Sequence, residues 1–176
     1  MGNFHVGASY LIVLLLAALG SGLMGGVFFA FSNFVMAALA RLAPAEGIRA
    51  MQMIDVTVLN RLFLSIFMGT GVLSIIAMVL SVLRWDGGNS ACALAGGGAY
   101  IFGTIVATMR GNVPLNNALA ALDADAPDSA QRWSAYVRDW SRWNHLRTIA
   151  CLLAMALFAL PLVRGAYSML AWRLMM

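Results

Sequence analysis

The sequence is poor in charge and contains no lysine. Only 10% of its 176 residues are charged, well below the ~25% of soluble domains, and all eleven basic residues are arginine. Hydrophobic residues make up 62% of the chain, and its mean hydropathy is +0.84. This composition excludes an ordinary soluble domain and predicts a membrane protein. The arginines lie between apolar runs, where orientation in a bilayer explains the net charge of +4, so we expect no nucleic-acid partner.

Cysteine and histidine are also scarce, with two of each. Cys92 and Cys151 both fall inside apolar runs, which favours buried free thiols over a disulfide. His5 and His145 are expected on opposite sides of the membrane, and neither HxxxH nor CxxC spacing occurs. The sequence therefore predicts no metal site.

Four apolar runs are long enough for a helix to cross the hydrocarbon core, which needs ~20 residues. We expect spans over about 9–39, 62–83, 91–109 and 146–163 of a single transmembrane domain, 1–176. The predicted fold is all-α: an integral membrane four-helix bundle with an amphipathic segment after the first span and a polar helical insert before the fourth. The first run has no Lys or Arg ahead of it and is too long for a signal peptide, so we expect no cleavage.

Small residues recur at positions where helices pack closely. Gly22 and Gly26 form a GxxxG pair in the first span. The third span carries a ridge of small residues at every fourth position: Ala91, Ala95, Ala99, Gly103, Ala107 and Gly111. These faces predict close helix packing and allow a homo-oligomer. We expect Gly111 to end this helix and Pro114 to begin another.

The arginines also predict an orientation. Eight lie on one side of the expected spans: Arg41, Arg49, Arg61, Arg110, Arg132, Arg138, Arg142 and Arg147. Three lie on the other: Arg84, Arg164 and Arg173. The excess of positive charge predicts that the first and third connections are cytoplasmic and both termini are outside, in a bacterial inner membrane.

The one long polar interval, from Arg110 to Thr148, is the candidate site. It joins two spans and carries polar side chains at both ends: Asn112, Asn116, Asn144, His145 and Arg147. Ionisable groups at a membrane boundary are costly and tend to be functional. We expect the two ends of the interval to meet and enclose a shielded cavity where the bundle opens.

Three motifs carry a resemblance to a known family. They are GVFFAFSNFVMAAL, NVPLNNAL and W..WNHLRT, in a chain of four spans. Together they resemble the anthrone oxygenase family of small membrane proteins, many bacterial members of which were long a domain of unknown function. The resemblance covers essentially the whole chain and includes Asn60 ahead of the second span. Ala37 and Ala38 depart from it, because a proline is expected after FVM.

The resemblance implies oxidation of an anthrone to an anthraquinone, as associated with a few fungal members, without an obvious cofactor. Such a reaction needs a base, donors for an oxyanion and a dry aromatic pocket. His145 is the candidate base, because histidine is the side chain that ordinarily changes charge near working pH. Arg147 is the second candidate catalytic residue, as an oxyanion donor. The candidate substrate-binding residues are Asn60, Asn112, Asn116, Trp140, Trp143 and Asn144. We expect no cofactor, since the substrate can supply the electrons.

Simpler interpretations exist for each of these residues. Interfacial tryptophans often form an aromatic belt, and the asparagines around Pro114 are typical helix caps. Arg147 is also suited to binding lipid phosphate, or to pairing with Asp139 or Asp55. On a straight helix, moreover, His145 lies opposite the stripe of Trp140, Trp143 and Arg147. Either the helix bends, or only one of these two faces lines the pocket.

Two functions of different classes remain. The first is a membrane oxygenase acting on a flat aromatic or quinone-type molecule such as an anthrone. The alternative is a non-catalytic membrane module that binds a lipid, a quinone or a partner helix. Both imply membrane lipid and a small aromatic or quinone-like ligand as partners.

Overall fold

The computed structural model describes residues 2–174, with the side chains of 7–167, 170, 171 and 174. The side chains of His5 and Arg173 lie outside this set, so the predictions for these two residues fall outside the described side chains. All regular structure in the described residues is helical, and four helices are long and apolar enough to cross a membrane. The protein is an integral membrane protein of all-α fold. The candidate spans are Gly7–Leu39, Arg61–Leu83, Gly88–Ala120 and Ser129–Tyr167.

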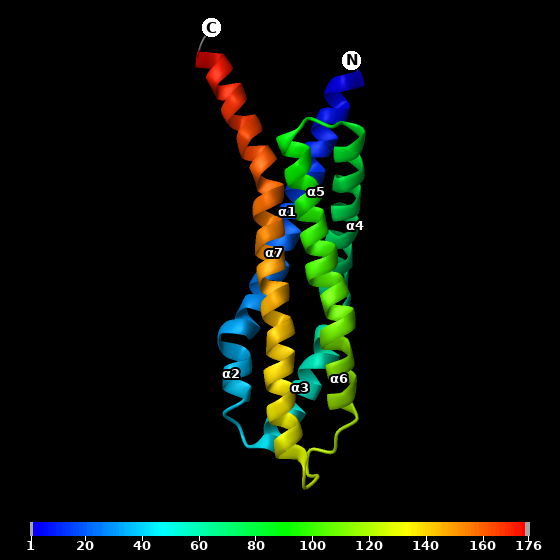
Figure 1. Cartoon of the computed structure of the whole chain (residues 1–176), viewed down its shortest axis with the longest axis vertical. Helices are drawn as coiled ribbons and strands as arrows, with labels where there is room; N and C mark the ends of the chain where they lie inside the picture. The colour runs from blue at the N-terminus through cyan, green and yellow to red at the C-terminus, as the bar shows by residue number, and fades with distance from the viewer. Residues whose placement is uncertain (1, 175–176) are drawn as a thin grey trace.

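The first span consists of α1 (Gly2–Ala30), the π-helical segment η1 (Phe31–Val35) and α2 (Met36–Leu39). A short loop leads to α3 (Pro44–Val58), the expected amphipathic segment, whose first turn contains Pro44 and Glu46. The second span is α4 (Arg61–Leu83), capped by the side chain of Asn60, which accepts a hydrogen bond from the amide of Phe63. Figure 1 shows α3 at the end of the molecule opposite the two termini.

The third span is continuous where we expected a break. It runs through α5 (Gly88–Tyr100), η2 (Ile101–Val106), η3 (Thr108–Asn112) and α6 (Val113–Ala120). The prediction that Gly111 ends the helix is wrong, because helical hydrogen bonding passes through it: the amide of Val113 bonds to the carbonyl of Thr108, five residues back. The π turn shifts the hydrogen-bond register, and Pro114 then falls in the first turn of α6, where no amide donor is required.

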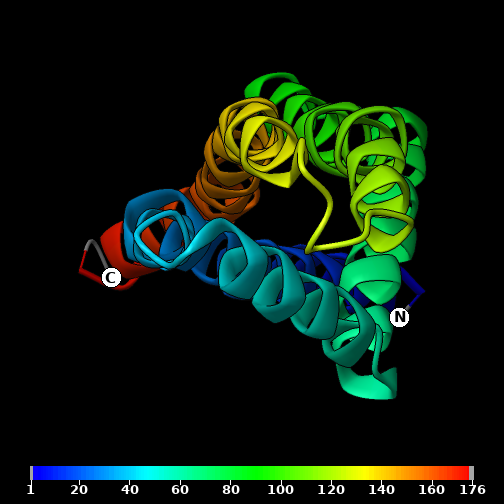
Figure 2. The same ribbon diagram turned by 90° about the horizontal axis from the view of Figure 1, so that it is seen from below.

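The fourth helix, α7 (Ser129–Leu174), is the longest. It includes the part of the polar interval from Ser129 onward together with the expected fourth span, and it continues through Pro161. α7 packs against α1 and α5, and α4 packs against the same two helices, so the four spans form a closed ring. Figure 2, viewed from the end that carries α3, shows α3 on one side of the ring and α6 and α7 across from it.

Glycines let these helices approach one another. A Cβ on Gly103 would overlap Ala150, and a Cβ on Gly111 would overlap the Trp143 ring, so the lower part of the ridge packs on α7 within the chain. Ala91 and Ala95 of the same ridge remain exposed, and homo-oligomerisation through them stays a prediction.

Two apolar clusters fill the interior. The span cluster lies among the four spans and contains Leu14, Met24, Phe28, Phe67, Tyr100, Cys151 and Phe158. The end cluster lies beneath α3 and contains Met36, Leu39, Ile48, Met51, Leu119, Trp133, Tyr136 and Trp140. Trp133, Tyr136 and Trp140 of α7 are therefore core residues.

Candidate functional site

A cavity of about 240 Å³ lies where the span cluster meets the end cluster. Phe28 and Phe67 of the span cluster line it from one side, and Met51 and Trp140 of the end cluster line it from the other. The residues of its wall come from α1, η1, α3, α4, η3, α6 and α7. The cavity thus depends on packing between segments far apart in sequence.

Arg147 projects into this cavity from the middle of α7 and is only 6% exposed. Its Nη2 donates to Asn144 Oδ1 at 2.7 Å, and its Nη1 donates to Thr108 Oγ1 at 3.4 Å. The guanidinium carbon lies 4.3 Å from the centroid of the Phe28 ring and 5.2 Å from that of Trp140. Among the described residues, no carboxylate forms an ion pair with it. A buried cation held by aromatic faces and neutral oxygens is costly, which favours a functional role.

Asp55 lines the same cavity from α3. Burial raises the pKa of Asp55 from its ordinary 3.8 to about 6, and the charge of Arg147 opposes the rise. Asn116 Nδ2 donates to Asp55 Oδ1 at 3.0 Å. The other end of the same amide, Asn116 Oδ1, accepts from Tyr136 Oη at 3.0 Å and from Trp140 Nε1 at 2.8 Å. Tyr136 and Trp140 of α7 therefore hold the Asn116 side chain in place, and Asn116 in turn orients the Asp55 carboxylate of α3.

Three buried atoms of cavity-lining side chains lack a hydrogen-bond partner among the described residues. They are Asp55 Oδ2, Asn112 Oδ1 and Arg147 Nε. Buried polar atoms in folded proteins nearly always have partners. The two other unpartnered side-chain atoms in the described part of the chain, Ser21 Oγ and Trp133 Nε1, do not line the cavity. This concentration around one cavity indicates a polar ligand or water bound there.

The remaining wall is aromatic and aliphatic. Its aromatic residues are Phe28, Phe31, Phe63, Phe67 and Trp140. Phe31 and Trp140 are tilted against each other with centroids 5.5 Å apart, and Phe63 stacks on Phe67 at 5.9 Å. An apolar pocket with a few convergent polar groups is the usual form of a small-molecule site, and these flat faces suit an aromatic ligand.

Two π-helical segments border the cavity. η1 contributes Phe31, and η3 contributes Thr108, Met109 and Asn112. A π turn inserts one residue and rotates the following helix face, so it points side chains inward that a regular helix would direct elsewhere. The residue pattern of a π turn does not differ from that of a regular helix, so the sequence does not reveal where these turns lie.

The cavity brings together four of the eight sequence-predicted site residues. Asn112, Asn116, Trp140 and Arg147 line it, so the two ends of the polar interval do meet. Asn112 Nδ2 also donates to the carbonyl of Trp140 at 3.3 Å, which joins the ends directly. Asn144 is fully buried behind Arg147, and its Nδ2 donates to the Phe28 carbonyl and to Ser32 Oγ, each at 2.8 Å.

The other three predicted residues lie away from the cavity. Asn60 is exposed and caps α4. Trp143 is 37% exposed and packs over Gly111. His145 is exposed on the opposite face of α7, where its Nδ1 lies 2.9 Å from Ser32 Oγ. The sequence left two faces of α7 as alternatives for the pocket wall. The face that carries Trp140 and Arg147 lines the cavity, and the face that carries His145 does not.

Sequence reasoning did not include Asp55 among the site residues, although it named Asp55 as a partner for Arg147. A signal was present, since Asp55 follows Met51 by four residues and precedes Val58 by three. It is therefore the one acidic residue on the apolar face of α3. The aromatic wall was missed because phenylalanines in apolar spans are indistinguishable from ordinary lipid-facing or core residues.

The described side chains include no group of three or more His, Cys, Asp or Glu residues placed to hold a metal ion. Comparison with known proteins identifies a family. A family model described as anthrone oxygenase matches residues 60–157, more than half of the chain. The match covers α4 to the middle of α7, including Asn112, Asn116 and Arg147, and excludes Asp55. No curated protein and no solved structure matches the chain.

Proposed function

The chain belongs to the anthrone oxygenase family, and on that premise we propose that it oxidises a flat aromatic substrate of the anthrone type with dioxygen. One observation carries the proposal. Asp55, Asn112 and Arg147 line a single aromatic-walled cavity, and each carries a buried side-chain atom that has no hydrogen-bond partner among the described residues. Asp55 Oδ2 supplies a base, Arg147 Nε supplies a donor for an oxyanion, and Asn112 Oδ1 supplies a further acceptor, all within a largely apolar pocket.

The reaction begins with removal of a proton from the ring CH₂ carbon opposite the carbonyl of the anthrone. The resulting carbanion is delocalised onto the carbonyl oxygen and reacts with dioxygen to form a C–O bond. The peroxide takes up a proton, and loss of water, with cleavage of the O–O bond and of the second C–H bond, leaves a carbonyl. The net change is CH₂ + O₂ → C=O + H₂O. Dioxygen is the sole oxidant, and no cofactor enters the scheme.

We assign the base to Asp55, because it lines the cavity and its pKa of about 6 lies near working pH. Arg147 is placed to stabilise negative charge on the carbonyl oxygen through Nε, and its own position is held by Asn144 and Thr108. Asn116 orients the Asp55 carboxylate. Phe28, Phe31 and Trp140 provide faces for the fused rings.

Oxygen consumption by the protein in lipid vesicles with anthrone tests these assignments, after subtraction of the spontaneous oxidation measured with heat-denatured protein. We expect Asp55→Asn to lower turnover by about 10²–10⁴, the range for loss of a general base. Arg147→Gln should lower it by about 10²–10³, as for loss of an oxyanion donor. Asp139→Asn is the matched control, since Asp139 lies outside the cavity on the same helix as Arg147.

His145 provides the decisive comparison, because the sequence pattern proposed it as the base. The exposed position of His145 predicts that His145→Gln retains most of the turnover. Loss of activity in this variant together with full activity in Asp55→Asn would return the base to His145. Saturable binding of anthrone with no turnover in the native protein would instead support the non-catalytic ligand-binding module.

A further inference from the structure

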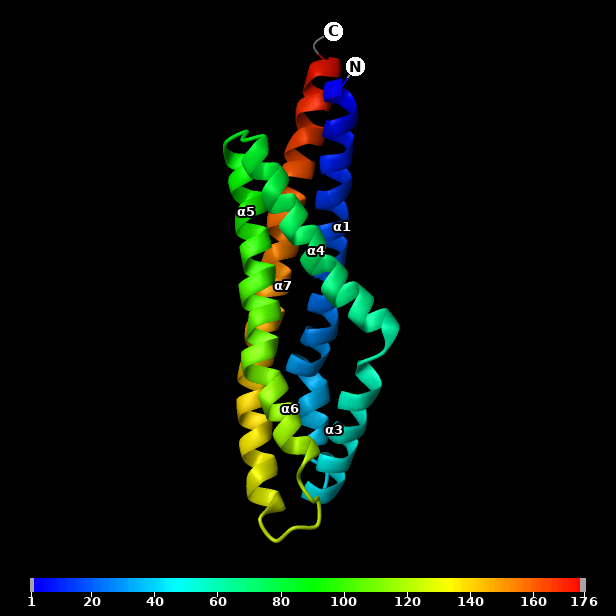
Figure 3. The ribbon, with the colours of Figure 1, turned by 90° about the vertical axis from the view of Figure 1, so that its right-hand side faces the viewer.

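Four side chains belong both to the cavity wall and to the outer surface. Leu59, Leu64, Met68 and Met109 line the cavity, yet Met68 is 53% exposed and Met109 is 60% exposed. A side chain that lines a cavity and is also half exposed lies at its opening. These four residues, called the mouth below, come from the turn before α4 (Leu59), from α4 (Leu64 and Met68) and from η3 (Met109). Figure 3 shows that α4 inclines away from the helix formed by α5 and α6 as it approaches the turn that joins α4 to α3.

The mouth opens toward lipid. Leu64 and Met68 begin an exposed apolar stripe along α4 that continues at helical spacing through Val72, Ile75 and Val79. α4 and the helix that carries Met109 are both candidate spans. Because exposed apolar side chains on a span contact acyl chains, the mouth that continues this stripe does so too.

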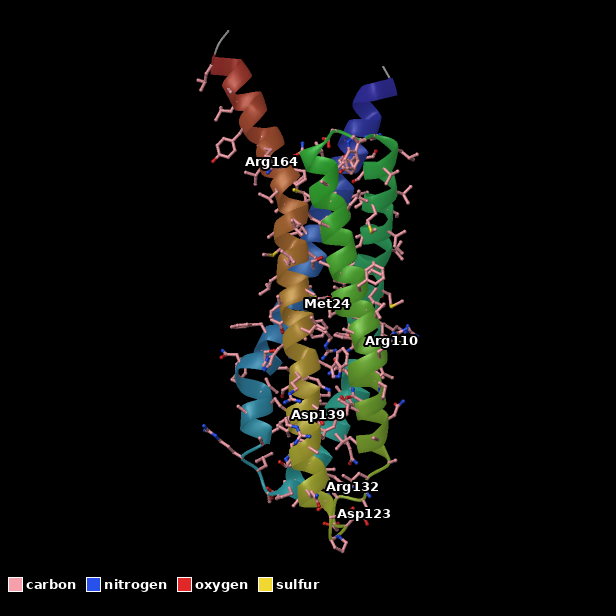
Figure 4. All side chains as sticks on the ribbon, viewed as in Figure 1. Met24, Arg110, Asp123, Arg132, Asp139 and Arg164 are labelled. Atoms are coloured by element: carbon pink, nitrogen blue, oxygen red, sulfur yellow. The ribbon has the colours of Figure 1, made fainter. Side chains whose placement is uncertain are left out.

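Two exposed arginines mark the depth of the mouth. Arg61 begins α4 three residues before Leu64, and Arg110 directly follows Met109. Figure 4 shows Arg110 on the outer side of its helix, about midway along the molecule. Arginines at the ends of apolar stretches place their charges at the headgroup level. Leu64, Met68 and Met109 of the mouth therefore lie just below the headgroups, on the hydrocarbon side, with Leu59 at the boundary.

The aqueous end of the cavity is covered. α3 lies over it and buries Ile48 and Met51 in the end cluster. Gln52 Nε2 donates to the carbonyls of Leu119 and Leu122, at 2.8 and 3.0 Å, which holds α3 against the end of α6. A molecule arriving from water at this end meets packed apolar side chains, whereas one arriving through the mouth reaches the aromatic wall directly.

We propose that the cavity takes its ligand sideways from the bilayer through the mouth, and that this ligand is a small, flat, apolar molecule dissolved in the hydrocarbon. The ligand class rests on the proposed function, but the route does not. The aromatic side chains contact the flat body of the ligand, and Arg147 Nε donates a hydrogen bond to an oxygen at the end of the ligand that enters first. The substrate is thus drawn from a pool concentrated in the membrane, and its supply depends on lipid partitioning.

Reversible obstruction of the mouth tests the route. Met68→Cys protein in phosphatidylcholine vesicles is modified with benzyl methanethiosulfonate, and the benzyl group is later released with dithiothreitol. Anthracene is the probe, because it partitions into lipid and accepts energy from tryptophan. Stopped-flow mixing with anthracene-loaded vesicles gives association and dissociation rates. A lipid-anchored tryptophan in protein-free vesicles sets the fastest observable transfer.

We expect the benzyl group to slow both association and dissociation by about tenfold or more, with the equilibrium Kd little changed, because obstruction of a route alters rates in both directions. Dithiothreitol should restore both rates. Val72→Cys is the matched control, since Val72 lies on the same stripe one turn away, does not line the cavity, and leaves the native Cys92 and Cys151 equally available to the reagent.

Unchanged rates in modified Met68→Cys protein would overturn the proposal. So would equal slowing in Val72→Cys, or a weaker Kd with an unchanged association rate, which would mean that the benzyl group occupies the cavity while ligand arrives elsewhere. Absence of saturable binding to the native protein would also overturn it. Anthracene has no carbonyl and is not turned over, so the test reports on the route even if Asp55→Asn and Arg147→Gln show that the proposed chemistry is wrong.

Discussion

At the scale of single residues, the site depends on two ionisable side chains that the fold removes from water without pairing them. Asp55 and Arg147 line one cavity, and each influences the other electrostatically, but they form no direct ion pair in the described structure. Paired directly, both charges would be satisfied and less available to a ligand. Their separation leaves an acceptor and a donor free, at a cost in stability that the aromatic stacking of Arg147 partly offsets.

The raised pKa of Asp55 predicts opposite effects of pH on activity and on stability. A base acts when ionised, so kcat/KM should rise with pH through about 6. The folded state holds the Asp55 proton up to about pH 6, while the unfolded chain releases it near 3.8, so the contribution of Asp55 to stability falls between these values. Asp55→Asn should remove this fall, and should raise Tm in detergent at pH 8 but not at pH 4. An equal gain in Tm at both pH values would contradict it.

At the scale of secondary-structure elements, glycine determines how closely η3 approaches α7. Gly111 lies against the indole of Trp143, and a Cβ there would overlap the ring. Thr108 of η3 also accepts a hydrogen bond from Arg147 of α7, and one turn earlier Thr104 of η2 contacts Cys151 of α7 at 3.1 Å. Close packing at Gly111 therefore sets the distance between the two helices that carry Asn112 and Arg147.

Gly111→Ala should consequently destabilise the protein by about 1–3 kcal/mol, the usual cost of overpacking. It should also lower turnover by separating Asn112 from Arg147. Gly26→Ala is the matched control, since no described atom lies within 4 Å of its added Cβ, and replacing a helix-interior glycine favours the helix by about 0.5–1 kcal/mol. Thermal unfolding of both variants in detergent measures the difference, and equal melting temperatures would show that the contact at Gly111 does not constrain the packing.

The position of α3 over the cavity depends on Gln52. Gln52→Ala removes two hydrogen bonds, one to the Leu119 carbonyl in the last turn of α6 and one to the Leu122 carbonyl just beyond it, and we expect α3 to loosen by about 1–3 kcal/mol. Hydrogen exchange should then increase in residues 44–58. Arg49→Ala is the control, because its ion pair with Asp125 is exposed and contributes about 0–1 kcal/mol. Faster exchange in both variants alike would mean that Gln52 is not the main anchor.

At the scale of the whole molecule, the arginines lie mainly at the end that carries α3. Figure 4 shows Arg132 at that end and Arg164 at the end where the termini lie. The positive-inside bias predicts that the α3 end, with the cavity near it, is cytoplasmic and that both termini are outside. The connection between α4 and α5 would then face outward.

Cysteine accessibility tests this orientation. Pro127→Cys lies in the exposed loop before α7, and Trp85→Cys lies in the exposed turn after α4. In spheroplasts of an expressing bacterium, a membrane-impermeant maleimide should label Trp85→Cys at once and Pro127→Cys only after permeabilisation. The unsubstituted chain, which retains Cys92 and Cys151, gives the background. The reverse labelling order would invert the predicted topology.

Local patterns in the sequence predict much of the architecture. The four apolar runs became four long helices, because a span of apolar residues in a bilayer has no other way to satisfy its backbone. The amphipathic pattern after Arg41 became α3, and the polar ends of the interval met at the cavity through Asn112 and Arg147. Asn60 failed as a cavity residue because an asparagine before a helix also satisfies a local cap.

The sequence by itself determined that the protein belongs in a membrane and that it is helical. It also singled out the candidate polar residues, because polar side chains inside a membrane protein are costly and tend to be functional. Only the tertiary structure decided which face of α7 lines the cavity, that the helix continues through Gly111, and that Asp55 joins Arg147 across 92 positions of chain. The reason is that periodicity records the phase of one regular helix. A π turn shifts that phase without changing the residue pattern, and contacts between helices far apart in sequence leave no trace in the spacing within either one.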